Sequence, residues 1–354
     1  MTVYTNTKIF HFKDKLDSLP KEVAGILPPL HLRIKPTNVC NHRCRYCAYL
    51  ADNLQLGKDM VVRDQIPWEK MEEIIEDLAA MGVQAVTFSG GGEPFCYPYF
   101  TRAIKKLAKT PIKFAALTNG SLLTGEIAEL FAEHATWLRV SMDGWDDESY
   151  KTYRNVPTGE HAKVMNNIAA FSKLGGKCKL GVSLVVDTKN AFHVYETIKK
   201  VRSVGANSIK VSACIVDNDG TKNNAYHWPR FDIVRDQIKE AKRCLADSTF
   251  EIYDAYHKLP ESFHKSYTWC PYCQILPIIG ADLNVYSCQD KAYNQKGLLG
   301  SIKQQSFKDF WCDGKHKFLH INPSLDCDHH CVAHTKNELI LDYLDVGNDY
   351  REFV

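Results

Sequence analysis

The sequence has no long apolar run, no excess of one charge and no low-complexity linker. No stretch approaches the about 18 consecutive apolar residues of a membrane-spanning helix, and the opening MTVYTNTKIFHFKDKLD lacks the apolar core of a secretory signal. The 44 basic and 42 acidic residues leave a net charge of +2, so no footprint for nucleic acid or a membrane surface is present. We expect a cytoplasmic protein without a membrane or nucleic-acid partner.

Cysteine, by contrast, is plentiful, with 13 residues in a chain of 354. Disulfides do not persist in the cytoplasm, so these thiols need another explanation. Five are isolated, at positions 96, 178, 214, 244 and 312. The other eight form an N-terminal group and a C-terminal group: Cys40, Cys44 and Cys47, then Cys270, Cys273, Cys288, Cys327 and Cys331. Clustered thiols in a reducing compartment indicate bound metal.

Short apolar runs alternate with longer amphipathic segments over the first two thirds of the chain. The runs span residues 30–36, 84–90, 112–120, 136–144, 178–186 and 207–216. Helical spacing of apolar residues follows at 68–82 and 192–205, and a further helix is expected at 228–246. Six β-then-α units predict parallel strands with right-handed crossovers. Because six units are too few for a closed eightfold barrel, we expect an open, partial barrel.

The chemically suggestive stretches all come where a predicted strand ends. TNVC follows the first strand, GGGEP the second and TNG the third, and SMDG closes the fourth. The C-terminal ends of parallel strands meet at one edge of the sheet, so these stretches are predicted to converge there.

The N-terminal group has the spacing C-x3-C-x2-C within TNVCNHRCRYCAYL, residues 37–50. Three thiolates on one loop can bind three irons of a [4Fe–4S] cluster and leave the fourth iron open for another ligand. A zinc site completed by His42 or by a distant residue is the alternative, and simple surface thiols are a third.

This triplet, with Tyr46 before its last cysteine, resembles the radical S-adenosylmethionine (radical SAM) superfamily, and GGGEP at 90–94 resembles the GGE motif of that family. The resemblance covers residues 30 to about 216. It implies that S-adenosylmethionine chelates the open iron and that its amino group is received by Gly91, Gly92 and Glu93. It also implies that Ser141 and Arg154 contact the ribose and the carboxylate, with Asn119 on the same rim.

The C-terminal group resembles the cysteine-rich extension called SPASM, or Twitch in its form with one cluster. The family pattern begins C-x(9–15)-G-x4-C. Cys288 ends it here, both Cys270 and Cys273 fall in the window, and Leu283 stands at the usual glycine position, which puts the tightness of that hairpin in doubt. The resemblance implies an auxiliary [4Fe–4S] cluster on Cys288, Cys327, Cys331 and one of Cys270 or Cys273. A zinc site using His329, His330 or His334 is the alternative.

The expected fold is therefore α/β, a partial (β/α)6 TIM barrel with a small C-terminal Cys-rich Twitch/SPASM-like iron–sulfur domain. We expect an N-terminal extension at 1–29, the radical SAM barrel at 30–235 and the auxiliary-cluster domain at 236–354. Peptide-modifying relatives often carry a leader-peptide domain before the barrel. Only about 30 residues precede the first strand here, which favours a small polar metabolite.

The resemblance implies reductive cleavage of S-adenosylmethionine to a 5′-deoxyadenosyl radical that abstracts a hydrogen atom from a sugar or aminocyclitol. Alcohol dehydrogenation, with the auxiliary cluster as electron acceptor, is our first expectation, and the electron donor would resemble flavodoxin or ferredoxin. Radical epimerisation, with Cys214 or Cys96 as hydrogen-atom donor, and modification of a peptide are alternatives. A zinc-stabilised, non-catalytic binding protein is an alternative of another class.

Overall fold

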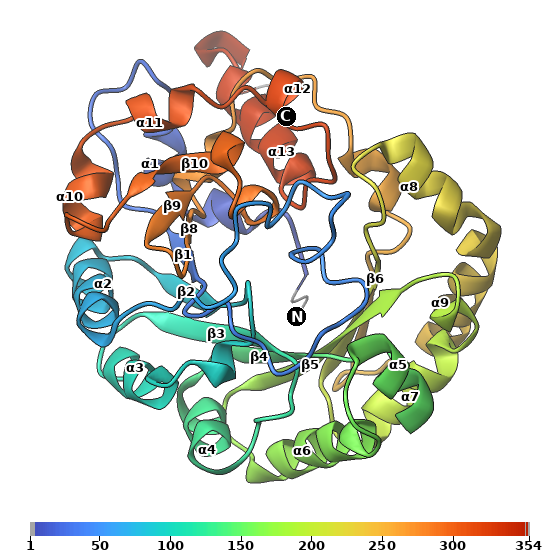
Figure 1. The fold of residues 1–354 in the computed structure, drawn as a ribbon. Coiled ribbons are helices and arrows are strands. Elements are labelled where there is room, and N and C mark those ends of the chain that lie inside the picture. Colours follow the sequence, from blue (N-terminus) through green and yellow to red (C-terminus); the bar gives the residue numbers. More distant parts are fainter. Residues whose placement is uncertain (1–3, 351, 353–354) are drawn as a thin grey trace.

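A computed structural model describes residues 4–350 and 352 and shows one ten-stranded sheet in the order β10-β9-β8-β1-β2-β3-β4-β5-β6-β7 (Figure 1). The strands are β1 (His31–Ile34), β2 (Ala85–Phe88), β3 (Lys113–Thr118), β4 (Trp137–Ser141), β5 (Lys179–Val186), β6 (Ser208–Ala213), β7 (Glu251–Asp254), β8 (Ile278–Ile279), β9 (Asn284–Tyr286) and β10 (Leu298–Ser301). From β1 to β7 every neighbouring pair is parallel, as the alternating pattern predicts.

The helices lie along the outer side of the curved sheet and at its two ends (Figure 1). They are α1 (Lys13–Asp17), α2 (Trp68–Met81), α3 (Phe100–Leu107), α4 (Gly125–His134), α5 (Asp147–Arg154), α6 (Glu160–Leu174), α7 (Val194–Ser203), α8 (Gly220–His227), α9 (Phe231–Leu245), α10 (Phe307–Cys312), α11 (His316–Leu319), α12 (Pro323–Asp326) and α13 (His334–Asp345). None of the helices in the described part of the chain is both long and apolar enough to cross a membrane.

All six predicted strands are confirmed, and a seventh parallel strand, β7, was not predicted. Its sequence, EIYD, has polar residues at both ends and no apolar run, so the pattern gives no strand signal there. The predicted helix at 228–246 begins at Phe231, because Trp228–Arg230 form a 3-10 turn that contains Pro229.

The alternation of side chains across the strands separates an apolar outer face from a polar inner face. Outward residues such as Ile34, Phe88 and Val182 are fully buried against the helices and form the main core. The positions between them point to the concave side and include Arg33, Thr87, Arg139, Ser183 and Lys210. The fold therefore surrounds a polar interior with an apolar shell.

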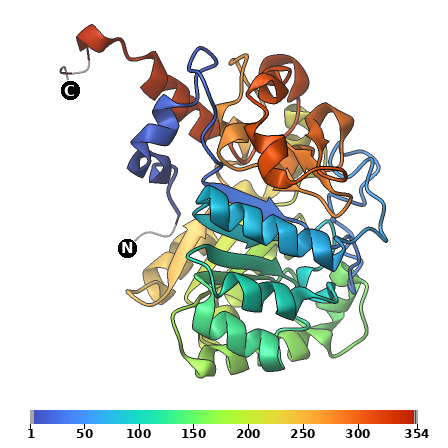
Figure 2. The same ribbon diagram turned by 90° about the vertical axis from the view of Figure 1, so that its left-hand side faces the viewer.

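The C-terminal residues extend the same sheet rather than starting a separate one. β8 pairs in parallel with β1, and β9 and β10 follow as antiparallel strands. Figure 2 shows these orange and red elements stacked beside the blue β1. The expected domain boundary at residue 235 stays a prediction, although α9 and β7 continue the barrel pattern to Asp254.

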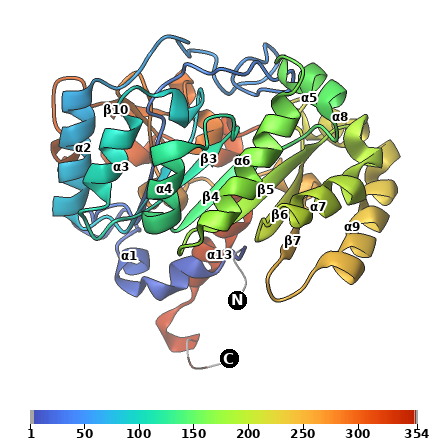
Figure 3. The same ribbon diagram turned by 90° about the horizontal axis from the view of Figure 1, so that it is seen from below.

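The two ends of the described chain close the barrel at the N-terminal ends of its strands, which is the lower side of Figure 3. The Tyr4 ring stacks on Tyr253 with 4.5 Å between centroids, and the Arg139 guanidinium donates to the Tyr4 hydroxyl at 3.0 Å. Helix α13 lies beside α1 at the same end (Figure 3). The other end, above the C-terminal ends of the strands, carries the cysteine loop.

The hairpin between β8 and β9 is tight even though leucine replaces the expected glycine. Leu283 adopts a left-handed backbone with φ of 61°, and its N–H donates to the Gly280 carbonyl at 3.0 Å. The Leu283 carbonyl accepts from the N–H of Ile302 at 2.9 Å, which connects the turn to the end of β10. The left-handed turn is thus made at a leucine, whose Cβ makes this conformation strained.

This strain predicts an inverted order of two substitutions. At φ of 61° a Cβ is unfavourable, so Leu283→Gly should be more stable than Leu283→Ala by about 1 kcal/mol. The buried Leu299 in β10 has no positive φ and should show the usual order, with Ala above Gly. Urea unfolding midpoints of the four variants measure both differences. If Leu283→Ala were more stable than Leu283→Gly, this result would contradict the strain.

Candidate functional site

The cysteine loop follows β1 and crosses the C-terminal ends of the strands (blue in Figure 1). The backbone carbonyls in the last turn of helix α5 accept hydrogen bonds from this loop. The N–H of Arg43 donates to the Arg154 carbonyl at 2.9 Å, and the N–H of Arg45 donates to the Tyr153 carbonyl at 3.0 Å. The last carbonyls of a helix lack partners within the helix, so the loop supplies them here.

The GGGEP loop packs its backbone directly on the cysteine loop. The N–H of Gly92 donates to the Thr37 carbonyl at 3.2 Å, and the N–H of Glu93 donates to the Val39 carbonyl at 2.9 Å. A Cβ on Gly92 would lie 2.1 Å from the Val39 carbonyl oxygen. The contact that needs glycine in this structure is therefore one between two loops, at the end of β1 and the end of β2.

The Glu93 carboxylate connects the ends of β2 and β3. Its Oε1 accepts from the Thr118 hydroxyl at 2.6 Å and from the N–H of Phe95 at 3.1 Å, and its Oε2 accepts from the N–H of Asn119 at 2.7 Å. Burial raises the pKa of Glu93 above its ordinary value, and these hydrogen bonds oppose the rise. Both oxygens are thus occupied by the strand-end loops.

Asn119 extends this network to the cysteine loop. Its side-chain Nδ2 donates to Asn41 Oδ1 at 2.7 Å, while its Oδ1 accepts from the N–H and the hydroxyl of Ser121. Asn41 also donates to the Ser121 hydroxyl at 2.8 Å. Three strand-end loops are therefore joined by hydrogen bonds, as the convergence of TNVC, GGGEP and TNG predicts.

Arg154 ends α5 and lies buried between Asp143 and Cys44. One guanidinium nitrogen forms an ion pair with the Asp143 carboxylate, and another lies 3.5 Å from Cys44 Sγ. Burial alone lowers the pKa of Arg154, but the charges of Asp143 and Cys44 more than offset this and raise it. Asp143 is held in turn by the N–H of Val185 at 2.8 Å. The guanidinium is therefore a fixed positive charge beside the middle cysteine.

The three loop thiols lie within electrostatic reach of one another. Burial is the main cause of the raised pKa of Cys40 and Cys47, and the charge of Cys44 adds to both. The His42 ring points elsewhere, with Nε2 3.5 Å from the Glu160 carboxylate. Within residues 4–350 and 352, no three His, Cys, Asp or Glu side chains converge as ligands of a single metal ion.

The remaining residues predicted for this site lie around the loop. Ser141 ends β4 on the concave side, and the ring of Tyr46 lies 6.0 Å from that of Tyr153. The hydroxyls of Tyr46 and Ser89 are buried and have no hydrogen-bond partner among the described residues. Two buried hydroxyls, one on the cysteine loop and one just after β2, are thus left without a partner in the described chain.

Cys214 lies beyond the end of β6, packed against a histidine. Its Sγ is 4.0 Å from His227 Nε2, which is also 2.8 Å from the Cys214 carbonyl oxygen. Burial raises the pKa of Cys214 to about 12, so the group stays a thiol at neutral pH. The Asp217 carboxylate, three residues further along the chain, caps a turn by accepting from the N–H of Asp219.

Four of the five C-terminal thiols form a second group. Burial is the largest cause of the raised pKa of Cys288, and the charges of Cys331, Cys327 and Cys270 raise it further. Cys270 likewise raises the pKa of Cys327 and of Cys331. Cys273 instead lies fully buried in the main core, and its thiol donates to the Cys270 carbonyl at 2.7 Å. Cys270, Cys288, Cys327 and Cys331 are thus connected by electrostatic influence, and Cys273 in turn raises the pKa of Cys270.

Two buried lysines influence the thiols of this second group, and no sequence pattern indicated either of them. Lys265 donates to the Phe263 carbonyl at 2.8 Å and also to the His329 carbonyl, and Lys291 donates to the Asp326 carbonyl at 2.5 Å. Both lysines lower the pKa of Cys327, although burial raises it overall. Both cations are thus buried against backbone carbonyls, close to thiols.

Two of the three histidines of the zinc alternative already contact neighbouring side chains, and the third does not hydrogen-bond within the described chain. His334 Nδ1 lies 3.2 Å from the Tyr267 hydroxyl, and its Nε2 lies 3.4 Å from Glu338. The His330 ring packs edge-on against Phe263. His329 is buried, and neither of its ring nitrogens has a hydrogen-bond partner in the described chain.

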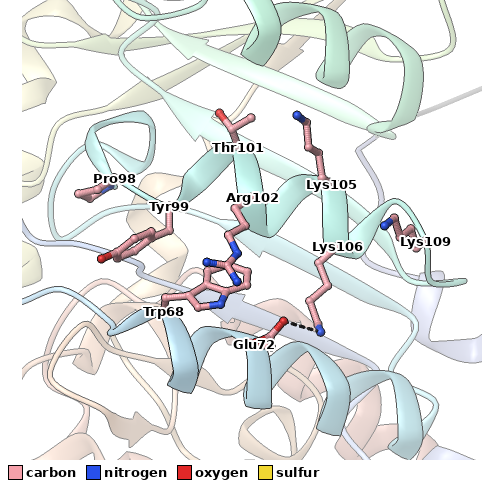
Figure 4. Close-up of a pocket in the computed structure, with 9 residues that line it drawn as sticks. All are labelled: Trp68, Glu72, Pro98, Tyr99, Thr101, Arg102, Lys105, Lys106 and Lys109. Atoms are coloured by element: carbon pink, nitrogen blue, oxygen red, sulfur yellow. Dashed lines mark hydrogen bonds and ion pairs between the residues drawn. The ribbon is translucent and has the colours of Figure 1, made fainter.

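A small cavity of about 50 Å³ lies between the two thiol groups. It is lined from the cysteine loop, the segment after β6 and the C-terminal segment, by Ala48, Leu54, Gln55, Leu56, Ile215, Asn218, Asp290, His329 and His330. A larger groove of about 630 Å³ lies on the outer surface between α2 and α3 (Figure 4). There Lys106 pairs with Glu72 and Glu76, and Arg102 stacks on Trp68, so the groove is a solvated surface away from the thiols.

Several residues of the site were missed in the sequence. Asp143 lies within the SMDG stretch that was singled out, and its buried partner Arg154 was predicted only to hold a ligand. Asn41 and Thr118 complete the loop network, and their positions beside Cys40 and Asn119 are the only signal that could have found them. Lys265 and Lys291 belong to no motif singled out in the sequence.

Residues 34–201 match the family model described as "Radical SAM superfamily". Among curated relatives, the chain is 34% identical over 151 residues to GTP 3',8-cyclase of Aeromonas hydrophila, covering 42% of this chain and 43% of that protein. It is 27% identical over 165 residues to an S-adenosylmethionine-dependent nucleotide dehydratase of Lacinutrix mariniflava, covering 47% and 30%. The chain spans less than half the length of these two relatives.

Among solved structures, SuiB of Streptococcus suis bound to the precursor peptide SuiA is similar, with a TM-score of 0.63 and 16% identity. The match covers 93% of this chain and 78% of that one, so it extends beyond the barrel, and at this identity it shows the fold alone. Residues 34–201 are a radical SAM domain, and this family implies a [4Fe–4S] cluster that binds S-adenosylmethionine.

The buried pair of Arg154 and Asp143 gives a prediction about stability. Arg154→Met leaves the Asp143 carboxylate buried without its partner and should cost about 3–5 kcal/mol. Adding Asp143→Asn removes that charge and keeps an oxygen for the N–H of Val185, so the double variant should be more stable than the single one. Urea unfolding of the three proteins tests this. A double variant that is less stable than Arg154→Met would contradict it.

Proposed function

We propose that this radical SAM enzyme oxidises an alcohol group of a small polar metabolite and that a second, auxiliary [4Fe–4S] cluster accepts an electron in the reaction. One observation carries the proposal. Four C-terminal thiols lie within electrostatic reach of each other, beside two buried lysines that have no carboxylate partner among the described residues: Cys270, Cys288, Cys327 and Cys331, with Lys265 and Lys291.

The cysteine loop suits a cluster that needs three protein ligands. We propose that Cys40, Cys44 and Cys47 bind one iron each; thiols that bind different irons need not converge on one point, in line with the absence of a single-ion site in the described chain. Buried hydroxyls of Tyr46 and Ser89 without partners support a polar ligand beside them. When bound, the cluster and S-adenosylmethionine supply a one-electron cleavage that yields a radical able to remove a hydrogen atom.

The proposed contacts to S-adenosylmethionine divide into two kinds. The side-chain oxygens of Glu93 and Asn119 already accept hydrogen bonds within the strand-end loops. We propose that these two residues maintain the geometry of the site. The backbone of Gly91 and Gly92 is then left to receive the amino group. Ser141, on the concave side, would contact the ribose, and Arg154, beside Cys44, would orient the carboxylate without leaving Asp143.

The auxiliary site suits an electron acceptor better than a site that binds substrate. Four thiols match the four irons of a cubane cluster and leave no iron open. Lys265 and Lys291 are buried against carbonyls, and a buried cation costs free energy unless a negative charge lies near. A cluster with four thiolates is negative, so its presence would explain both lysines.

Oxidation of an alcohol to a carbonyl removes a hydrogen atom, a proton and an electron. The small cavity at Asp290 and His329 is lined from both the cysteine loop and the C-terminal segment, and we propose that the substrate binds near it. The electron donor, of the flavodoxin or ferredoxin kind, is part of the proposal.

The N-terminal ligands can be tested against an isolated thiol. Cys44→Ala should reduce iron from roughly eight to about four atoms per chain and abolish formation of 5′-deoxyadenosine, because one cubane cluster is lost. Cys312 is exposed and isolated, so Cys312→Ala should keep both. Anaerobic purification, iron assay and reductive incubation with S-adenosylmethionine give the result. Unchanged cleavage in Cys44→Ala would end the proposal.

The auxiliary ligands give a matched pair three residues apart. Cys270→Ala should lose about half of the iron and keep cleavage of S-adenosylmethionine, whereas Cys273→Ala should keep all of the iron. The reason is that Cys273 lies in the core and donates to a backbone carbonyl, while Cys270 influences the other three thiols. The reverse result would exchange their roles, and loss of all iron in either variant would refute two separate sites.

The remaining alternatives differ in their reaction products and in the colour of the purified protein. A dehydrogenase yields oxidised product in proportion to 5′-deoxyadenosine. An epimerase, with the Cys214 thiol as donor, yields an inverted centre that carries solvent deuterium. A zinc-stabilised binding protein is colourless, whereas two clusters give a brown protein with broad absorbance near about 400 nm.

A further inference from the structure

The concave face of the barrel sheet carries four cationic side chains. They occupy inward positions of three strands: Arg33 in β1 and Lys35 just after it, Arg139 in β4 and Lys210 in β6. The residues between them, such as Ile34, Val140 and Ile209, are fully buried against the helices. Because side chains alternate along a strand, the four cations share the inner side of the sheet.

The partners of these cations are neutral. Arg33 donates to Gln289 Oε1 at 2.6 Å, Lys35 donates to the Gly90 carbonyl at 2.8 Å, and Arg139 donates to the Tyr4 hydroxyl at 3.0 Å. The Nε atoms of both arginines are buried and have no hydrogen-bond partner in the described chain. No carboxylate among residues 4–350 and 352 forms an ion pair with any of the four.

The cations also act on each other. Burial lowers the pKa of Lys210 to about 8, and the charges of Arg139, Lys336 and Arg33 lower it further. Burial and then Arg33 lower the pKa of Lys35. The positive charges of these side chains are not balanced by an equal negative charge nearby in the described chain, so they repel one another.

Acidic groups at this face are few and placed to one side. Asp290 influences Arg33, Lys35 and Lys210 and accepts from the N–H of Val332 at 2.8 Å. Glu251, at the start of the outer strand β7, influences Lys8. Lys8 and Lys336 add further positive charge at the closed end of the barrel. The cations therefore outnumber the acids around the interior.

We propose that the concave face binds an oxyanion of the substrate, a phosphate or a carboxylate, through Arg33, Arg139 and Lys210. The inference rests on the proposed function for the reaction and deepens it by naming the substrate class. The open Nε edge of each arginine and the ammonium of Lys210 supply donors that match such a group. Of the metabolites considered, an acidic or phosphorylated sugar fits this face, and a positively charged aminocyclitol does not.

Sugars that share one carbon skeleton but differ in charge serve as the probes. We expect glucose 6-phosphate or glucuronate to bind the anaerobic holoenzyme with S-adenosylmethionine present, and glucose and glucosamine not to bind under the same conditions. Isothermal titration calorimetry at low and raised salt measures this, and binding should weaken as salt increases. Preference for glucose 6-phosphate indicates a phosphate group, and preference for glucuronate indicates a carboxylate.

Two variants and a control locate the site. Lys210→Met and Arg139→Met should each weaken binding of the anionic sugar about tenfold or more, because a charged hydrogen bond is lost. Lys113→Met makes the same change of charge at the exposed start of β3 and should bind as the wild type does. Lys210 has no hydrogen-bond partner in the described chain, so its replacement removes charge with little effect on folding.

Iron content and cleavage of S-adenosylmethionine in the same samples test the proposed function separately. A brown, cleaving protein that binds no anionic sugar, or binds it equally in Lys210→Met and Arg139→Met, would overturn the anion site alone. Binding of glucose or glucosamine as tight as that of the anionic sugars would overturn it too. Anion binding that depends on Lys210 in a protein without iron would support the site and refute the cluster proposal.

Discussion

The site depends on the direct contact between the GGGEP loop and the cysteine loop. Two backbone hydrogen bonds join the loops at a distance that a Cβ on Gly92 would not allow. Glu93 then fixes the end of β3 to the end of β2, and Asn119 reaches back to Asn41 beside the first cysteine. The loop that carries Cys40, Cys44 and Cys47 is held further by the backbone of α5 and by the ion pair between Arg45 and Asp187.

The sequence predicted the barrel well, since buried parallel strands and amphipathic helices leave strong patterns. It missed β7, a short polar strand at the sheet edge whose pairing comes from tertiary context. It predicted the convergence of the strand-end loops but not their hydrogen bonds. It also could not choose between Cys270 and Cys273, because the spacing fits both. Cys273 is fully buried in the core and Cys270 only partly, and the choice of Cys270 as ligand stays a prediction.

The distribution of charge is the second feature that no motif revealed. Cations in the strands alternate with apolar residues, so Arg33, Arg139 and Lys210 read as the polar face of ordinary strands. Only closure of the sheet around them brings three separate strands together. Lys265 and Lys291 are similar, since nothing in their neighbourhood in the sequence indicates burial.

The parallel pairing of β8 with β1 has one more consequence. With β9 and β10 it covers the side of β1 that faces away from β2, where unpaired N–H and C=O groups would otherwise be exposed. Exposed strand edges promote aggregation, and this one belongs to the strand that leads into the first cysteine. A shortened chain ending before Ile278 would therefore risk insolubility as well as the loss of Cys288, Cys327 and Cys331.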